Sequence, residues 1–148
     1  MIRYISLLLL SSIYLFGLGF WTLTGVTKAN IYIQNAVVYL KAETKVTARE
    51  KMTAMLKSQD IKLDLPDSPT LMLDLQDIEN DGEHYVYIKL ALGEEVRTFR
   101  DDKSAAFAIT YQVTDFLEVN TQELDKEILE SVDFLLSQFV EQFEDDKE

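Results

Sequence analysis

The sequence contains no cysteine, two prolines, five glycines and a single histidine. Without cysteine, the chain cannot form disulfides, a cysteine-ligated zinc site, a thiolate nucleophile or a lipid attachment at an N-terminal cysteine. The few glycines form no phosphate-binding loop, and no Gly-x-Ser-x-Gly motif marks a hydrolase nucleophile. We therefore predict no metal and no cofactor, and we favour a protein that is not an enzyme.

Basic residues are also scarce, with 14 lysines and arginines against 26 acidic residues and a formal net charge of −12. This balance opposes binding to nucleic acid or to an anionic membrane surface, because both are bound through cationic side chains. The acidic excess is greatest in residues 115–148, which hold twelve acidic and two basic residues. A protein partner of this chain is therefore expected to carry a basic surface.

A long apolar run occupies residues 4–26, interrupted only by serine, threonine and glycine, and it follows Arg3. The small residue Ala29 comes shortly after it. This pattern predicts a secretory signal peptide over residues 1–29, cut after Ala29. The run also reaches the length of about 20 residues that spans a bilayer, so an uncleaved N-terminal anchor is the alternative. In the first case residues 30–148 form a periplasmic or secreted domain, and in the second a domain anchored outside the cytoplasm through residues 4–26.

The periodicity of apolar residues changes along this predicted single domain. Alternating or β-branched residues predict strands within 30–45, 61–65, 71–75, 86–100 and 107–113. Helical spacing predicts helices within 46–59, which begins with a capping box of Thr47 and Glu50, and within 120–143. The order β-α-β-β-β-β-α predicts an α+β domain of two layers, with two helices on one face of a mainly antiparallel sheet of about 4–5 strands.

The predicted helix over 120–143 has one apolar face and one acidic face. Asn120 as the N-cap, Glu123 at the third helical position and Val119 as a staple against Leu124 predict where it begins. Phe134 lies on the acidic face. An aromatic side chain ringed by charge is typical of a partner-binding hot spot, although a single exposed apolar residue is also ordinary. The predicted partner-binding residues are Phe134, Glu127, Glu130 and Glu141.

The helices are expected to cover one face of the sheet and leave the other open. Three tyrosines and an arginine in the last two strands are predicted to line this open face and to bind a ligand there: Tyr85, Tyr87, Tyr111 and Arg97. The alternative is that these side chains only pair across neighbouring strands on a wet surface.

Two further patterns resemble functional motifs but have simpler explanations. Asp77–Gly82 has the acidic residues and glycine of the first half of a calcium loop. The twelfth position, where that loop needs a bidentate glutamate, is Ile88, so we predict a polar hairpin turn instead. His84 follows this turn and is predicted to be a surface residue.

These observations favour a non-enzymatic exported envelope protein that acts by binding another protein. One alternative is a carrier of a small ligand or lipid, with a cavity between the helices and the sheet. A less favoured alternative is a hydrolase that uses paired carboxylates.

Overall fold

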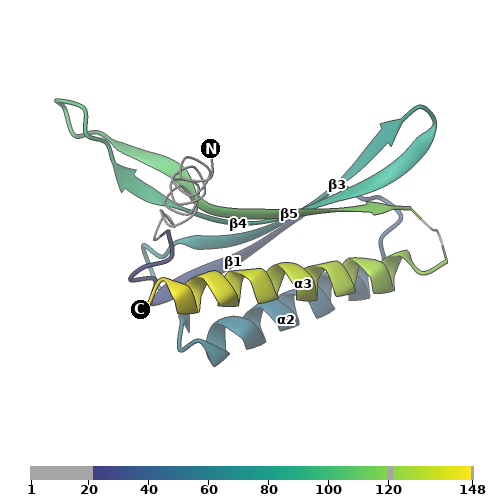
Figure 1. The fold of residues 1–148 in the computed structure, drawn as a ribbon, viewed down its shortest axis with the longest axis horizontal. Helices are drawn as coiled ribbons and strands as arrows, with labels where there is room; N and C mark the ends of the chain where they lie inside the picture. Colours follow the sequence, from purple (N-terminus) through teal and green to yellow (C-terminus); the bar gives the residue numbers. More distant parts are fainter. Residues whose placement is uncertain (1–21, 120–121, 148) are drawn as a thin grey trace, which may run out of the picture.

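The computed structural model describes residues 22–119 and 122–147, which form a five-stranded sheet with both helices on one face (Figure 1). This arrangement confirms the predicted α+β, two-layer fold and its order of elements. The elements are β1 (Lys28–Asn35), α2 (Ala42–Ser58), β2 (Lys62–Leu63), β3 (Thr70–Asn80), β4 (Glu83–Arg97), β5 (Ala105–Glu118) and α3 (Leu124–Asp145).

The strands lie in the order β2-β1-β3-β4-β5. β1 runs parallel to both β2 and β3, whereas β3, β4 and β5 are antiparallel to one another. Parallel neighbours cannot be joined by a tight turn, and α2 provides the crossover from β1 to β2.

The core lies between the sheet and the two helices. Alternate residues of the central strands point into it, and one face of each helix covers them. Full burial of a leucine, isoleucine or phenylalanine side chain contributes about 1.5–3 kcal/mol. The packing of these side chains between the sheet and the helices therefore provides most of the stability of the two-layer arrangement. Its most deeply buried members include Leu71, Leu73, Leu75, Ile88, Leu90, Leu92, Met52, Leu56, Ile128, Leu135 and Phe139.

Residues 22–27 precede β1, and two of them, Leu23 and Val26, already belong to this core. Leu23 is only 1% exposed, and its backbone N–H donates to Asp146 Oδ2, 2.8 Å away at the end of α3. We call the end of the sheet where these residues join β1 the entry end, and the end with the β3–β4 turn the distal end. Residues 1–21 of the predicted signal peptide or anchor lie outside the described residues. Neither helix of the described chain is long and apolar enough to cross a membrane.

The first strand is shorter than predicted, because the chain leaves the sheet after Asn35. The Asn35 side chain accepts a hydrogen bond from the Val37 N–H (2.9 Å) and donates one to the Val37 carbonyl (3.2 Å). A side chain that hydrogen-bonds the backbone two residues ahead favours a turn over continued strand. The segment 36–40 therefore passes over the distal end and carries Val38 and Tyr39 with it.

The predicted capping box at the start of the first helix is wrong. The helix begins at Ala42, so Thr47 and Glu50 lie inside it, and no side-chain hydrogen bond is made at its N-cap, Lys41. A carboxylate from the other helix, Asp125, satisfies this end instead.

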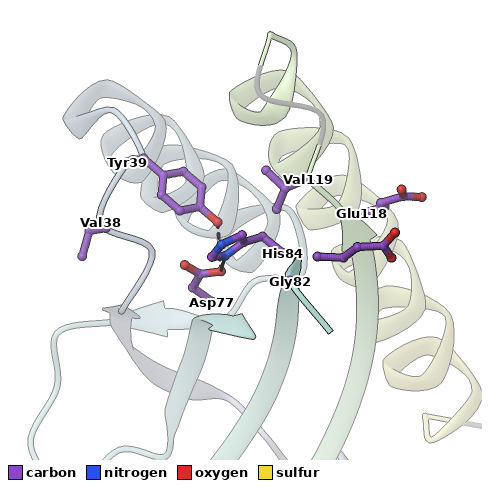
Figure 2. A pocket seen from close by; sticks show the side chains of 8 residues that line it. Val38, Tyr39, Asp77, Gly82, His84, Glu118 and Val119 are labelled. Carbon is purple, nitrogen blue, oxygen red and sulfur yellow. Dashed lines mark hydrogen bonds and ion pairs between the residues drawn. The ribbon is translucent and has the colours of Figure 1, made fainter. Parts of the chain in front are cut away.

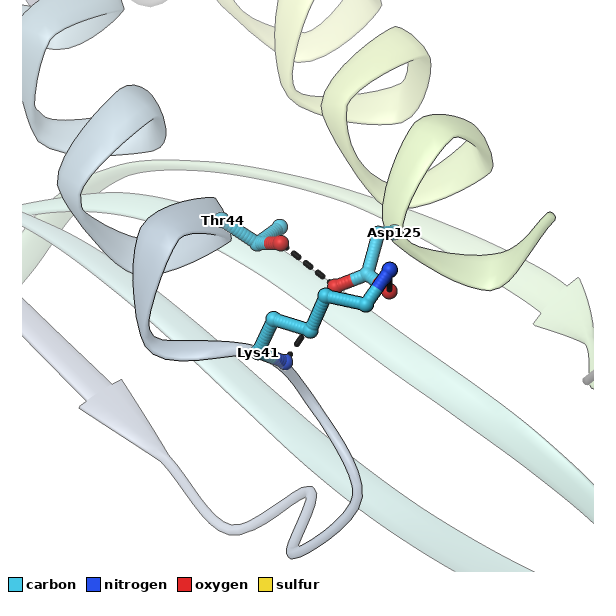
Figure 3. Close-up of polar contacts among 3 residues, drawn as sticks. All are labelled: Lys41, Thr44 and Asp125. Atoms are coloured by element: carbon cyan, nitrogen blue, oxygen red, sulfur yellow. Dashed lines mark hydrogen bonds and ion pairs between the residues drawn. The ribbon is translucent and has the colours of Figure 1, made fainter.

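Asp125 Oδ1 accepts hydrogen bonds from the Lys41 N–H (3.2 Å) and from the Thr44 hydroxyl, and Oδ2 lies 3.2 Å from Lys41 Nζ (Figure 3). The cap thus comes from a residue 84 positions away in the sequence. A local pattern search cannot find such a partner.

The N-cap predicted for α3 also differs from the one in the structure. The helix begins at Leu124, and Glu123 occupies the N-cap without a side-chain cap hydrogen bond. The predicted cap, Asn120, lies outside the described residues. The buried side of the helix agrees with its apolar periodicity.

A bulge between β4 and β5 reverses the alternation of β5. Leu92 pairs with Tyr111 but Gly93 pairs with Ile109, which leaves Thr110 as the extra residue. The bulge turns Phe107 and Ile109 to the open face, where both are exposed. Tyr111 pairs with the buried Leu92 and faces the helices, where it is 8% exposed and makes an edge-to-face contact with Phe139 at 5.3 Å between ring centroids. The prediction that Tyr111 lines the open face is therefore wrong.

Candidate functional site

A cavity of about 540 Å³ lies at the distal end of the sheet (Figure 2). We call it the distal cavity. The segment before α2, the β3–β4 hairpin and the end of β5 contribute its lining residues, which are Val38, Tyr39, Asp77, Gly82, Glu83, His84, Glu118 and Val119.

A tight turn builds one wall of the distal cavity. Asn80 pairs with Glu83, so the β3–β4 loop contains only Asp81 and Gly82, with φ angles of 53° and 81°. Two consecutive positive φ angles define the type I′ turn that Asp-Gly sequences favour. The predicted polar turn is thus a two-residue hairpin, and its register places Asp77 beside His84.

The side chains of Tyr39, Asp77 and His84 form the polar centre of the distal cavity. Asp77 Oδ1 accepts a hydrogen bond from the Tyr39 hydroxyl at 3.0 Å and lies 3.2 Å from His84 Nδ1. Burial, followed by the hydrogen bond to Asp77 and its charge, raises the pKa of Tyr39 to about 12. Tyr39 is therefore a fixed donor at neutral pH, and it is a poor nucleophile.

Two further carboxylates, Glu83 and Glu118, lie at the rim of the distal cavity and extend towards the open face of the sheet, on the side of Tyr85. Glu83 Oε2 accepts a hydrogen bond from the Tyr85 hydroxyl at 2.6 Å, and this bond and the Glu83 charge raise the pKa of Tyr85. Within residues 22–119 and 122–147, no basic side chain lies at ion-pair distance from Glu83 or Glu118. The local charge is thus available to a positively charged group from outside.

Apolar side chains complete the lining. Val38 is 90% exposed, and Val119 is held beside the hairpin by a hydrogen bond of 3.0 Å from its N–H to the His84 carbonyl. Carboxylates next to an apolar wall suit the end of a lysine or arginine, which combines an aliphatic stem with a charged group.

The chemistry available in the distal cavity is limited. Its lining contains no serine, threonine or cysteine that the pair of His84 and Asp77 would activate. In the described part of the chain, no group of three or more histidine, cysteine, aspartate or glutamate side chains is placed to hold a metal ion.

The structure brings the four predicted partner-binding residues onto the outer side of α3. Phe134 is 53% exposed, Glu130 and Glu141 are exposed, and Glu127 is half-buried. Their spacing of three, four and seven residues places them in one stripe along the helix. We call these four residues the α3 stripe.

The predicted ligand face is only partly assembled. Tyr85 and Tyr87 are half-buried on the open face, where Tyr87 packs against Phe116 at 4.9 Å between ring centroids. Arg97 lies twelve residues further along β4, at the entry end, which is about 40 Å of extended strand. With Tyr111 in the core, these four residues do not form one site.

The distal cavity combines residues that the sequence patterns treated separately or missed. Asp77 and His84 were each considered alone, and Tyr39 was assigned to a strand. The Asp-Gly turn was the usable signal, because a two-residue hairpin fixes which residues pair across it. Comparison of the sequence with protein-family models and with curated proteins gives no match.

Proposed function

We propose that this protein is a non-enzymatic, exported binding protein of the cell envelope. In this proposal the distal cavity receives a basic side chain from a partner protein. The observation that carries the proposal is the position of Glu83 and Glu118, which lie at the rim of the distal cavity and form no ion pair within the described chain.

Two features support a protein partner over an enclosed small ligand or lipid. The space between the sheet and the helices is filled by fully buried side chains such as Leu73, Ile88 and Phe139. The distal cavity is instead at the end of the sheet, with the exposed side chain of Val38 in its wall. A small organic cation in the same cavity is the second candidate, because it would use the same carboxylates.

The α3 stripe is a rival surface for a basic partner. Phe134 provides an exposed aromatic anchor there, with Glu127, Glu130 and Glu141 around it. The residues of the α3 stripe come from one helix, whereas three segments of the chain meet at the distal cavity, so we place the primary contact at the distal cavity.

A peptide titration of the full-length protein in detergent micelles separates the two surfaces. The probe is a short peptide of lysine and leucine, and the reference probe has glutamate in place of lysine. NMR shifts of the Val38 and Val119 methyl groups report on the distal cavity. The test variant is Glu83→Gln with Glu118→Gln, and its matched control is Glu127→Gln with Glu130→Gln, which removes the same charge from the α3 stripe.

We expect the lysine peptide to shift both valines and the glutamate peptide to shift neither. The distal double variant is expected to weaken binding about 10-fold, which corresponds to about 1.4 kcal/mol, while the control changes affinity about 2-fold or less. Equal weakening in both variants, or shifts confined to α3, would contradict the assignment to the distal cavity. A free alkylamine that binds there more tightly than the peptide would identify the small-cation alternative.

A further inference from the structure

The residues just before Asn30 are part of the folded domain. Val26 and Ala29 are buried along with Leu23. Lys28 and Ala29 also make the entire pairing of β1 with β2, through Lys62 and Leu63. A cut after Ala29 would therefore remove three core side chains and separate β2 from the sheet.

Polar contacts fasten the same segment to the end of α3. Besides the bond from the Leu23 N–H, the Asp146 carboxylate accepts one from Gln142 Nε2 at 2.6 Å, and the Thr24 hydroxyl lies 3.4 Å from the Asp146 carbonyl. The Asp146 side chain is buried, so loss of Leu23 would leave a buried carboxylate without its backbone donor. Removing one partner from a buried charged group is costly.

The folded domain consequently includes the last residues of the apolar run. Residues 4–21 contain no charged residue, and Thr22 alone lies between them and the buried Leu23. This run of 18 residues falls within the range of about 17–25 that spans a bilayer. No linker is left between the run and the domain.

From these contacts we propose that the chain is not cut after Ala29 and that a lipid bilayer holds the domain by its entry end. The β4–β5 tip, residues 97–105, then contacts the lipid headgroups. This proposal does not rest on the function assigned to the distal cavity.

The β4–β5 tip lies at the same end of the domain as residues 22–28 (Figure 1). Residues 24–28 share a hollow with Glu94, at the base of this hairpin. The tip itself is closed by a hydrogen bond of 3.0 Å from the Thr98 N–H to the Ser104 carbonyl. It therefore projects beside the point where the apolar run enters the domain.

The side chains of the tip suit a membrane interface. Phe99 is fully exposed, and its basic neighbours Arg97, Arg100 and Lys103 outnumber Asp101 and Asp102 in a chain that is otherwise strongly acidic. Aromatic and basic side chains are those that settle at the lipid headgroups.

A fluorescence experiment on the full-length protein tests the lipid contact. Trp21 is the single tryptophan, so Trp21→Phe provides a background in which Phe99→Trp reports on the tip. The matched control is Val38→Trp, also at an exposed site, at the distal end. Both proteins are reconstituted into vesicles of phosphatidylcholine and phosphatidylglycerol, with and without brominated acyl chains that quench tryptophan on contact.

We expect the emission of the tryptophan at position 99 to be quenched in brominated vesicles and that of the tryptophan at position 38 to be the same in both lipids. Equal emission at position 99 in both lipids, or equal quenching at the two positions, would overturn the proposed orientation.

The intact mass of the wild-type protein from the membrane fraction of an expressing host tests the retained segment. A mass that includes residues 4–21 supports the proposal. A chain that begins at Asn30, or anywhere after Trp21, overturns it. Neither measurement involves the peptide titration, so the two proposals can fail separately.

Discussion

Asp125 is the residue through which α3 holds the beginning of α2. The hydrogen bond from the Thr44 hydroxyl, assisted by the backbone and side chain of Lys41, lowers the pKa of Asp125 below its ordinary value of 3.8. These contacts outweigh the effect of burial, which acts in the opposite direction. A carboxylate that caps a helix from another element links the two helices at a single point.

Replacing Asp125 is expected to destabilise the protein in a pH-dependent way. At neutral pH, Asp125→Asn should lower the free energy of unfolding by about 1–2 kcal/mol, because a charged acceptor at a helix start is lost. The folded state favours ionised Asp125, so its contribution is complete above pH 3.8 and is lost as the pH falls through the lower folded pKa. Urea unfolding of both proteins over this range measures the difference.

The matched control for this change is Asp133→Asn, which removes an exposed ion pair of 2.8 Å with Lys51 between the same two helices. Its cost should be about 0–0.5 kcal/mol, since exposed pairs contribute little. Equal costs for the two variants at neutral pH would mean that Asp125 does not act as a cap.

At the scale of the elements, Gly93 allows a close approach of side chains beside the bulge between β4 and β5. A Cβ atom built on Gly93 would lie 2.3 Å from Phe107 Cζ and 2.9 Å from Met72 Cε. The absence of a side chain lets the Phe107 ring lie across the open face of the sheet.

Gly93→Ala is therefore expected to displace the Phe107 ring and to cost about 1 kcal/mol. In a Phe107→Ala background the added methyl group meets no ring, so the cost should fall to less than half. A double-mutant cycle by chemical denaturation measures this coupling. Additive effects of the two substitutions would show that Phe107 does not rest on Gly93.

The sequence patterns predicted the elements and layers but not the details that join them. The spacing of apolar residues in α3, β3 and β4 depends directly on which side chains are buried, so it was enough to predict the fold class. The bulge at Gly93 turns Phe107 and Ile109 to the open face, because a shift by one residue moves the side chains beyond it to the other face. Tyr111 lies on the other side of the bulge and alternates with Val113 and Leu117 on the helix side. Its grouping with Tyr85 and Tyr87 by residue type overlooked this alternation.

The distal cavity was less accessible to sequence reasoning than the fold. Its walls come from three segments, and Tyr39 reaches Asp77 across 38 positions of sequence. Periodicity reports on one element at a time and contains no information about which ends of different elements meet. The helix cap from Asp125 to Lys41 was missed for the same reason.

At the scale of the whole molecule, the two ends of the domain differ in kind. The entry end holds both ends of the described chain, because residues 22–27 pack beside the end of α3 through Asp146. The distal end holds the turn and the unpaired carboxylates. The inferred bilayer contact and the proposed binding cavity therefore lie on opposite ends, and a partner can reach the cavity while the entry end is occupied.

Leu23→Ala tests this organisation through stability. In the full-length protein in detergent micelles, we expect the free energy of unfolding to fall by about 2–4 kcal/mol, because a fully buried leucine is truncated next to the Asp146 contact. Leu65→Ala, at an exposed site, should cost less than about 1 kcal/mol. A protein processed after Ala29 would lack residue 23 altogether, so its Leu23→Ala form would unfold like the wild type. If Leu23→Ala substantially lowers the free energy of unfolding of protein isolated from membranes, then Leu23 is both retained in the chain and packed in the core.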